Sequence, residues 1–177
     1  MTLRVRELDK IQDKRAVEAI DTGFETDAIF ELIARERTLE LVERKLQKPM
    51  LKRYSIREVF APWGRWERGW VAEDSAVRGF ACVEHEPWHE RLVLWFLYVE
   101  PAYRRRGVGR SLLAQVESFG REVEASHVWL ETSNVNVPGV RAYNQLGYTL
   151  CGADALHYGS YMPNETALFL AKRLGGG

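Results

Sequence analysis

The sequence has no excess of either charge and no long apolar run. Its 25 Lys and Arg residues balance 25 Asp and Glu residues, so the basic excess typical of a dedicated nucleic-acid binder is missing. No apolar run approaches the roughly 20 residues of a membrane helix, and the first ten residues lack the apolar core of a secretion signal. We therefore expect a soluble cytoplasmic protein without nucleic-acid or membrane partners.

Cysteines and metal-ligand patterns are also scarce. Cys82 and Cys151 are too few for a disulfide framework, and their apolar surroundings predict buried free thiols. The four histidines are not spaced as metal ligands relative to one another or to either cysteine, so we expect no metal site. A Walker loop and a complete Gly-x-Gly-x-x-Gly dinucleotide motif are missing as well.

What is present predicts one mixed α/β domain over residues 1–177. Hydrophobic residues make up 46% of the chain and charged residues 28%, which is enough apolar material for a core. Alternating and continuous apolar patterns predict strands, and apolar residues at helical spacing predict helices. The expected strands are 3–6, 70–73, 77–84, 92–99, 127–132, 148–153 and 166–171, and the expected helices are 9–23, 109–123 and 137–147. Residues 30–46 fit both a helix and a pair of strands.

Glycine and arginine concentrate at 103–111, between the apolar strand 92–99 and the helix that follows. Gly107 and Gly109 leave backbone N–H groups uncovered, and the helix start adds partial positive charge, so a phosphate group fits this turn. Further positive charge comes from Arg104, Arg105, Arg106 and Arg110. The alternative interpretation is a tight turn with solvated arginines.

Two motifs resemble those of the GNAT superfamily of N-acetyltransferases. Arg104-x-x-Gly107-x-Gly109 resembles its acetyl-CoA signature, and Asn136-x-x-Gly139-x-x-Ala142-Tyr143 followed by Leu146-Gly147-Tyr148 resembles its second motif. The resemblance implies a GNAT-like domain, in which a central twisted mixed β-sheet is flanked by helices. It also implies that acetyl-CoA binds in a splay between central strands, beside residues 92–99.

The resemblance extends to the streptothricin acetyltransferases and their relatives. The segments that carry it are 21–27, 49–54 and 130–137, the last reading Leu-Glu-Thr-x-Asn-Val-Asn-Val. On this likeness, residues 30–35 and 39–46 are interpreted as paired strands that turn at Glu36–Arg37.

The resemblance also implies how acetyl-CoA is held. The backbone of residues 97–99 pairs with the pantetheine arm and offers an amide to the thioester oxygen. Tyr143 protonates the leaving thiolate, although an ordinary helix aromatic packed beside Tyr148 is the alternative. The residues implied to bind the cofactor are Leu97, Tyr98, Val99, Arg104, Arg105, Arg106, Gly107, Val108, Gly109, Arg110, Ser111, Asn136 and Tyr143.

The acceptor side departs from the pattern of the streptothricin group. Trp95 and Phe96 stand at the positions of that group's two central carboxylates, and their rings can attract a cation but cannot accept a proton. With them, Trp63 and Trp66 in a nearby loop are candidate acceptor-binding residues. The remaining candidates for the general base are Glu84, Glu86, Glu131, His85 and His89.

The sequence therefore predicts an acetyl-CoA-dependent N-acetyltransferase. The expected acceptor is a primary amine on a small molecule, with a streptothricin-type antibiotic as one candidate and antibiotic resistance as the role. The alternatives are a peptide or protein N-acetyltransferase and a non-catalytic acyl-CoA-binding sensor. A homodimer is expected from the habit of the family.

Overall fold

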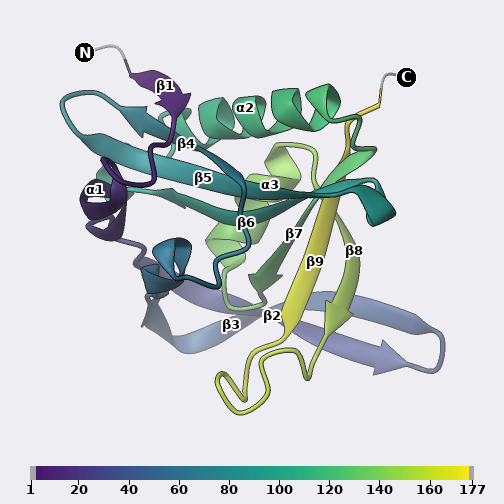
Figure 1. The fold of residues 1–177 in the computed structure, drawn as a ribbon. Coiled ribbons are helices and arrows are strands. Elements are labelled where there is room, and N and C mark those ends of the chain that lie inside the picture. The colour runs from purple at the N-terminus through teal and green to yellow at the C-terminus, as the bar shows by residue number, and fades with distance from the viewer. Residues whose placement is uncertain (1–2, 176–177) are drawn as a thin grey trace. The chain divides into compact units, whose positions relative to one another are not determined.

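The computed structural model describes residues 3–175, which form two compact units (Figure 1). The first unit contains the described residues of 1–23, 53–129 and 173–177, and the second contains Phe24–Lys52 and Leu130–Lys172. The chain therefore passes between the units four times. That the two units act as a single domain, 1–177, stays a prediction.

The first unit is built on four antiparallel strands in the order β1-β4-β5-β6. The predicted strands 70–73, 77–84 and 92–99 form two consecutive hairpins, with turns after Glu73 and at Pro87–His89. The bounds of the strands are β1 Arg4–Glu7, β4 Arg68–Glu73, β5 Val77–Glu86 and β6 Arg91–Val99. A further strand, β7 (His127–Ser133), begins in this unit and ends in the second.

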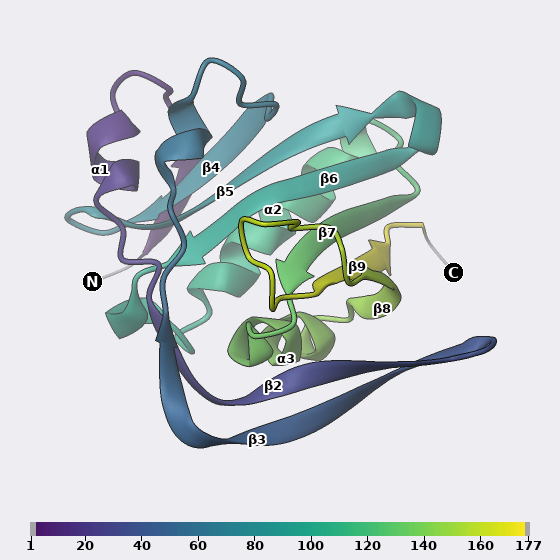
Figure 2. The same cartoon turned by 90° about the horizontal axis from the view of Figure 1, so that it is seen from below.

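Helices cover both faces of this part of the sheet. The long α2 (Val108–Glu122) packs along β4, β5 and β6 with the apolar stripe that its sequence predicts. The short α1 (Lys14–Glu18) and the 3₁₀ turn Arg57–Phe60 lie on the opposite face (Figure 2). There Val17 and Val59 pack with Phe80 of β5 in a second apolar cluster.

A β-bulge interrupts β6, which the sequence predicts as a regular buried strand. Cys82 of β5 pairs with Phe96, whereas the next residue, Val83, pairs with Leu94. Trp95 is thus an extra residue without a partner on β5, and its side chain is 39% exposed. An extra residue bends a strand and re-aims the side chains that follow it.

The bulge changes which face of the sheet the β6 side chains cover. Before it, Leu92 lies under α2, beside Gly120. After it, Phe96 and Tyr98 pack against the cluster on the opposite face, with their ring centroids 6.5 Å and 5.8 Å from that of Phe80. The period-two alternation of the strand therefore shifts by one residue at Trp95.

The first helix is shorter than the 9–23 predicted from the sequence. Asp9 does cap the backbone N–H of Gln12, at 2.8 Å, but this turn is not continued as a helix, and Ile11 is 88% exposed. The helix begins only after Asp13, whose carboxylate is bound to Arg6 and does not cap it. The helix therefore begins later than the sequence predicts, at a residue whose side chain is paired with Arg6 of β1.

The second unit contains a two-stranded ribbon, three strands of the order β7-β9-β8, and one helix (Figures 1 and 2). Arg35 pairs with Thr38, so the predicted strand pair and its turn at Glu36–Arg37 are confirmed. The predicted helix that ends at Gly147 is also present. The bounds are β2 Phe24–Arg35, β3 Thr38–Lys52, α3 Val137–Gln145, β8 Thr149–Asp154 and β9 Ala167–Arg173.

The two cysteines differ in their surroundings. Cys82 is buried as a free thiol, and burial raises its pKa. The prediction of a buried thiol is wrong for Cys151, which is exposed on β8 and directs its sulfur at the carbonyl of Phe169, at 3.4 Å. Apolar neighbours in the sequence alternate between two faces of a strand, and this position lies on the open one.

Removing the Arg6 guanidinium should destabilise the first unit, since Asp13 is buried and accepts two of its hydrogen bonds, at 2.6 and 2.8 Å. Arg6→Ala is expected to lower the free energy of unfolding by about 1–3 kcal/mol. The hydrogen bond to Arg6 lowers the pKa of Asp13 below its ordinary value of 3.8. This stabilisation is therefore complete above pH 3.8 and disappears as the pH falls through the folded-state pKa.

Urea unfolding at neutral and acidic pH measures both effects. Arg4→Ala is the matched control, because Arg4 is exposed on the same strand. If Arg6→Ala and Arg4→Ala lowered the free energy of unfolding equally, a role for the Arg6–Asp13 pair would be contradicted.

Candidate active site

The glycine turn before α2 has the geometry of an anion site. Gly107 occupies the N-cap position with a φ of +85°, which favours glycine, and no side chain caps the helix there. A Cβ at Gly107 would meet nothing within 4 Å, and one at Gly109 would meet only Val99, at 3.9 Å. The first N–H groups of a helix have no partner within the helix. Here these N–H groups lie in a turn with room around its two glycines, next to exposed Arg110 and Ser111.

Arg104 behaves differently from the other arginines of the turn. Its Nε donates to the carbonyl of Val99 at 2.9 Å, and its Nη1 donates to the carbonyl of Gly23 at 2.7 Å. Desolvation lowers its pKa. Its guanidinium therefore ties the end of β6 to the segment before β2, and its contact with acetyl-CoA stays a prediction. Arg105 and Arg106 remain exposed, with Arg106 over the Tyr103 ring at 5.6 Å.

Residues 97–99 lead from the bulge into this turn. Leu97 pairs with Ala81 and Val99 pairs with Gly79 across the β5–β6 ladder. All three residues of the segment stay partly exposed despite this pairing. The segment is thus accessible in the way that a cofactor-pairing strand requires, although its contact with acetyl-CoA stays a prediction.

Asn136 and Tyr143 belong to the second unit. The Asn136 side chain caps α3, since its Oδ1 accepts from the N–H of Gly139 at 3.1 Å and its Nδ2 donates to Thr132 at 3.0 Å. A Cβ at Gly139 would lie within 2.7 Å of that amide, which explains the glycine in the motif. Tyr143 is half-exposed, with its ring 5.6 Å from that of Tyr148. The predicted packing contact exists, and the acid role stays a prediction.

Glu131 on β7 has the environment of a general base. Burial raises its pKa, the nearby Glu165 carboxylate acts in the same direction, and a hydrogen bond from the Tyr158 hydroxyl opposes them. His157 Nε2 lies 4.0 Å from its other oxygen. A carboxylate whose pKa is raised toward neutrality is a stronger proton acceptor than an ordinary one.

Sequence reasoning missed the partners of Glu131. Tyr158 and His157 come from the irregular stretch between β8 and β9, where no pattern singles them out. The neighbouring Glu165 is bound by the Lys52 ammonium and by the Ser133 hydroxyl. Glu165 is therefore neutralised by its partners, whereas among residues 3–175 Glu131 has no lysine or arginine within ion-pair distance.

Glu84 on β5 has different partners. One of its oxygens accepts from the indole N–H of Trp95 at 2.9 Å, and the other lies 3.4 Å from Arg65. The carboxylate therefore lies between an aromatic ring and a cation, an arrangement that suits cation binding.

Glu86 and the two turn histidines make local contacts. Glu86 accepts from Arg91 at 2.7 Å and from the His89 ring at 3.2 Å when that ring carries the proton. Burial opposes ionisation of Glu86, but these two partners lower its pKa overall. His85 is held through its backbone N–H, which donates to Glu67 at 3.0 Å. None of these contacts indicates that Glu86, His85 or His89 is the general base.

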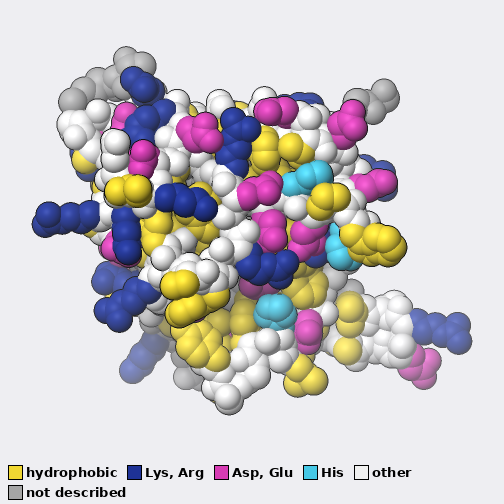
Figure 3. Space-filling view, in the orientation of Figure 1, with side chains coloured by type: hydrophobic (Ala, Val, Ile, Leu, Met, Phe, Trp, Pro, Cys, Tyr) yellow, Lys and Arg dark blue, Asp and Glu magenta, His cyan; other side chains and the backbone are white. Residues whose placement is uncertain are grey.

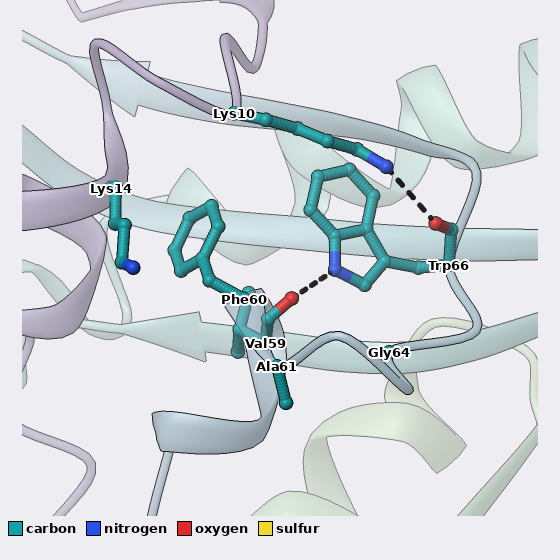
Figure 4. Close-up of a pocket in the computed structure, with 7 residues that line it drawn as sticks. All are labelled: Lys10, Lys14, Val59, Phe60, Ala61, Gly64 and Trp66. Atoms are coloured by element: carbon teal, nitrogen blue, oxygen red, sulfur yellow. Dashed lines mark hydrogen bonds between the residues drawn. The ribbon is translucent and has the colours of Figure 1, made fainter.

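Of the two loop tryptophans, Trp66 is the one that lines a cavity. Its indole N–H donates to the carbonyl of Val59, and its ring lies 6.2 Å from Phe60 and beneath the Lys10 ammonium, at 4.1 Å (Figure 4). It thus packs in the core and also forms a wall of a cavity of about 200 Å³. Trp63 is 73% exposed and is not part of that wall. The lining residues are Lys10, Lys14, Val59, Phe60, Ala61, Gly64 and Trp66.

The described chain, 3–175, contains no cluster of three His, Cys, Asp or Glu side chains that could hold a metal ion. Within the same residues, no helix combines the length and apolar character needed to cross a membrane.

Comparisons with known proteins assign the family. The model described as the acetyltransferase (GNAT) family matches residues 27–148. Streptothricin acetyltransferase of Streptomyces lavendulae is 33% identical over 174 residues, which are 90% of this chain and 89% of that protein. The crystal structure of nourseothricin acetyltransferase superposes with a TM-score of 0.88 at 33% identity, covering 99% of this chain and 100% of that one.

A second solved structure shares the fold and contains the cofactor. It is a protein of Bacillus anthracis str. Ames in complex with acetyl coenzyme A, with a TM-score of 0.82 at 24% identity, covering 98% of this chain and 99% of that one. The mixed α/β GNAT-like fold predicted from the two motifs is thereby confirmed. The chain belongs to the GNAT family and is an N-acetyltransferase that uses acetyl-CoA.

Proposed function

We propose that this enzyme acetylates a primary amine of a streptothricin-type antibiotic and so confers resistance to it. The observation that carries the proposal is 33% identity to a streptothricin acetyltransferase over nine-tenths of the chain. We also propose that it works in the cytoplasm as a homodimer, as the sequence predicts.

In this proposal the glycine turn binds the cofactor. The N–H groups at the start of α2 would hold the pyrophosphate, with charge from Arg105, Arg106 and Arg110. Bound acetyl-CoA supplies the thioester carbonyl that the acceptor amine attacks. A backbone N–H within residues 97–99 would donate to that carbonyl oxygen, where negative charge develops.

The proton transfers fall to residues of the second unit. Glu131 would remove the proton that the attacking nitrogen must lose, because burial raises the pKa of its carboxyl above the ordinary value. Tyr143 would donate its hydroxyl proton to the departing thiolate. Glu84 would attract a cationic group of the acceptor, because it lies beside the Trp95 ring at a position that a cation of this chain already contacts.

An acceptor panel tests the function directly. Thiol release from acetyl-CoA is expected with streptothricin and not with short peptides, free amino acids or aminoglycosides. Release with peptides alone would overturn the small-molecule proposal.

Gly107→Asp should weaken acetyl-CoA binding by about tenfold or more, because a like charge enters the phosphate turn. A side chain fits there, since nothing lies within 4 Å of the added Cβ. Gly107→Asn is the matched control, because asparagine has nearly the same shape and tolerates a positive φ. Equal dissociation constants for the two variants by calorimetry would contradict the placement of the pyrophosphate.

Glu131→Gln should lower kcat/KM by about a hundredfold and remove the acid limb of its pH profile. The wild-type limb should lie above 4.5, the ordinary value for this carboxyl, because burial raises its pKa. Tyr158→Phe should move the limb to still higher pH, because it deletes the hydrogen bond that lowers that pKa. Glu40→Gln, on exposed β3, is the control. An unmoved limb in both variants would exclude Glu131 as the base.

A further inference from the structure

We propose that the acceptor carries a second cationic group, a guanidinium or an ammonium, which binds the face of Trp95 beside Glu84 and displaces Arg65 from it. The proposal deepens the function above and rests on it, because it specifies what the acceptor must contain besides the amine that reacts. It makes Arg65 a residue that determines substrate specificity.

The bulge in β6 creates the platform. Because Trp95 is the extra residue, its indole is not packed opposite a β5 side chain and stays 39% exposed. Its N–H donates to Glu84 Oε2 at 2.9 Å, which fixes the ring beside a carboxylate whose side chain is only 19% exposed. An aromatic face next to a largely buried carboxylate attracts cations through both the ring and the charge.

A cation of this chain already occupies the platform. The Arg65 guanidinium lies 5.5 Å from the centroid of the Trp95 ring, 3.4 Å from Glu84 and 3.7 Å from Glu86. Its side chain is 60% exposed, and it belongs to a stretch without helix or strand. Ion pairs this exposed contribute little to stability, so a competing cation can replace Arg65 at small cost.

The surrounding charges favour a cation over an anion. Glu86 is already neutralised by Arg91, at 2.7 Å. Within residues 3–175, Arg65 is the one cation at ion-pair distance from Glu84, so displacing Arg65 leaves Glu84 unpaired. Carboxylates and histidines gather over this end of β5 and β6 (Figure 3).

The position along β6 fits a second group of the acceptor. Trp95 is two residues from Leu97, which is about 7 Å in an extended strand. Residues 97–99 are those proposed to hold the acyl end of the cofactor. A small molecule can therefore place its amine at the acyl group while a second cation binds Trp95.

Agmatine and pentylamine test this on the full-length enzyme. Agmatine has a primary amine joined by an alkyl chain to a guanidinium, and pentylamine has the amine without the guanidinium. Agmatine is expected to bind about tenfold more tightly by calorimetry and to show the correspondingly lower KM. It should also shift the indole N–H resonance of Trp95, identified by its loss in Trp95→Phe. Equal affinities for the two amines, or no binding of either, would overturn the proposal.

Two variants move the preference in opposite directions. Glu84→Gln should abolish the preference for agmatine, whereas Glu58→Gln, at an exposed carboxylate of the 57–60 turn, should keep it. Arg65→Ala should tighten agmatine binding by about fivefold, because the internal competitor is gone. A folding defect cannot produce that gain. Arg57→Ala is its matched control, and weaker agmatine binding in Arg65→Ala would show that Arg65 is not a competitor.

The binding readouts separate this inference from the proposed function. If agmatine binds with the expected preference but streptothricin is not acetylated, the cation site stands and the substrate proposal fails. If streptothricin is acetylated but neither variant alters the preference, the substrate proposal stands and the cation site is refuted.

Discussion

The one-residue register shift between β5 and β6 is the constraint on which the site in the first unit depends. Because Cys82 pairs with Phe96 and Val83 pairs with Leu94, Trp95 is released from the ladder. The shift sends Phe96 and Tyr98 into the apolar cluster behind the strand. It also leaves the Trp95 indole beside Glu84. Without the bulge, the strand would present alternate residues to each face throughout, and Trp95 would take a different face.

The candidate carboxylates are distinguished by their partners more than by their place in the sequence. Glu84 accepts from an indole N–H and lies beside an arginine. Glu165 is bound by Lys52. Glu131 is half-buried beside a tyrosine hydroxyl, and burial raises its pKa. Three residues of one type thus have different chemical surroundings, because the packed chain gives each of them different neighbours.

The arginines of the turn at 103–111 are likewise distinguished by their partners. The sequence counts all four arginines as positive charge around the turn, but the Arg104 guanidinium donates to the carbonyls of Val99 and Gly23. That contact holds the strand end from which the glycine turn departs. The positive φ of Gly107 then opens the backbone donors, and the exposed arginines supply the charge. An anion site of this kind needs both a rigid frame and free charge.

The sequence by itself determined most of the elements, the glycine turn and the family, whereas the strand pair at Glu36–Arg37 followed only from the family resemblance. Such features depend on local periodicity, on glycine and proline, and on short motifs, which one segment of chain carries alone. It overestimated the first helix and misplaced Cys151, because the Arg6–Asp13 pair and the outward face of β8 are decided by other segments.

Only the tertiary structure decided which side chains contact the candidate site residues. Arg65 meets Trp95, and Tyr158 meets Glu131, across 30 and 27 positions of the chain respectively. Contacts of this range are set by strand register and by burial, and no local pattern encodes them. The pKa of Glu131 and the cation over Trp95 therefore follow from the packed chain, whereas the glycines and arginines of the turn at 103–111 can be recognised in the sequence.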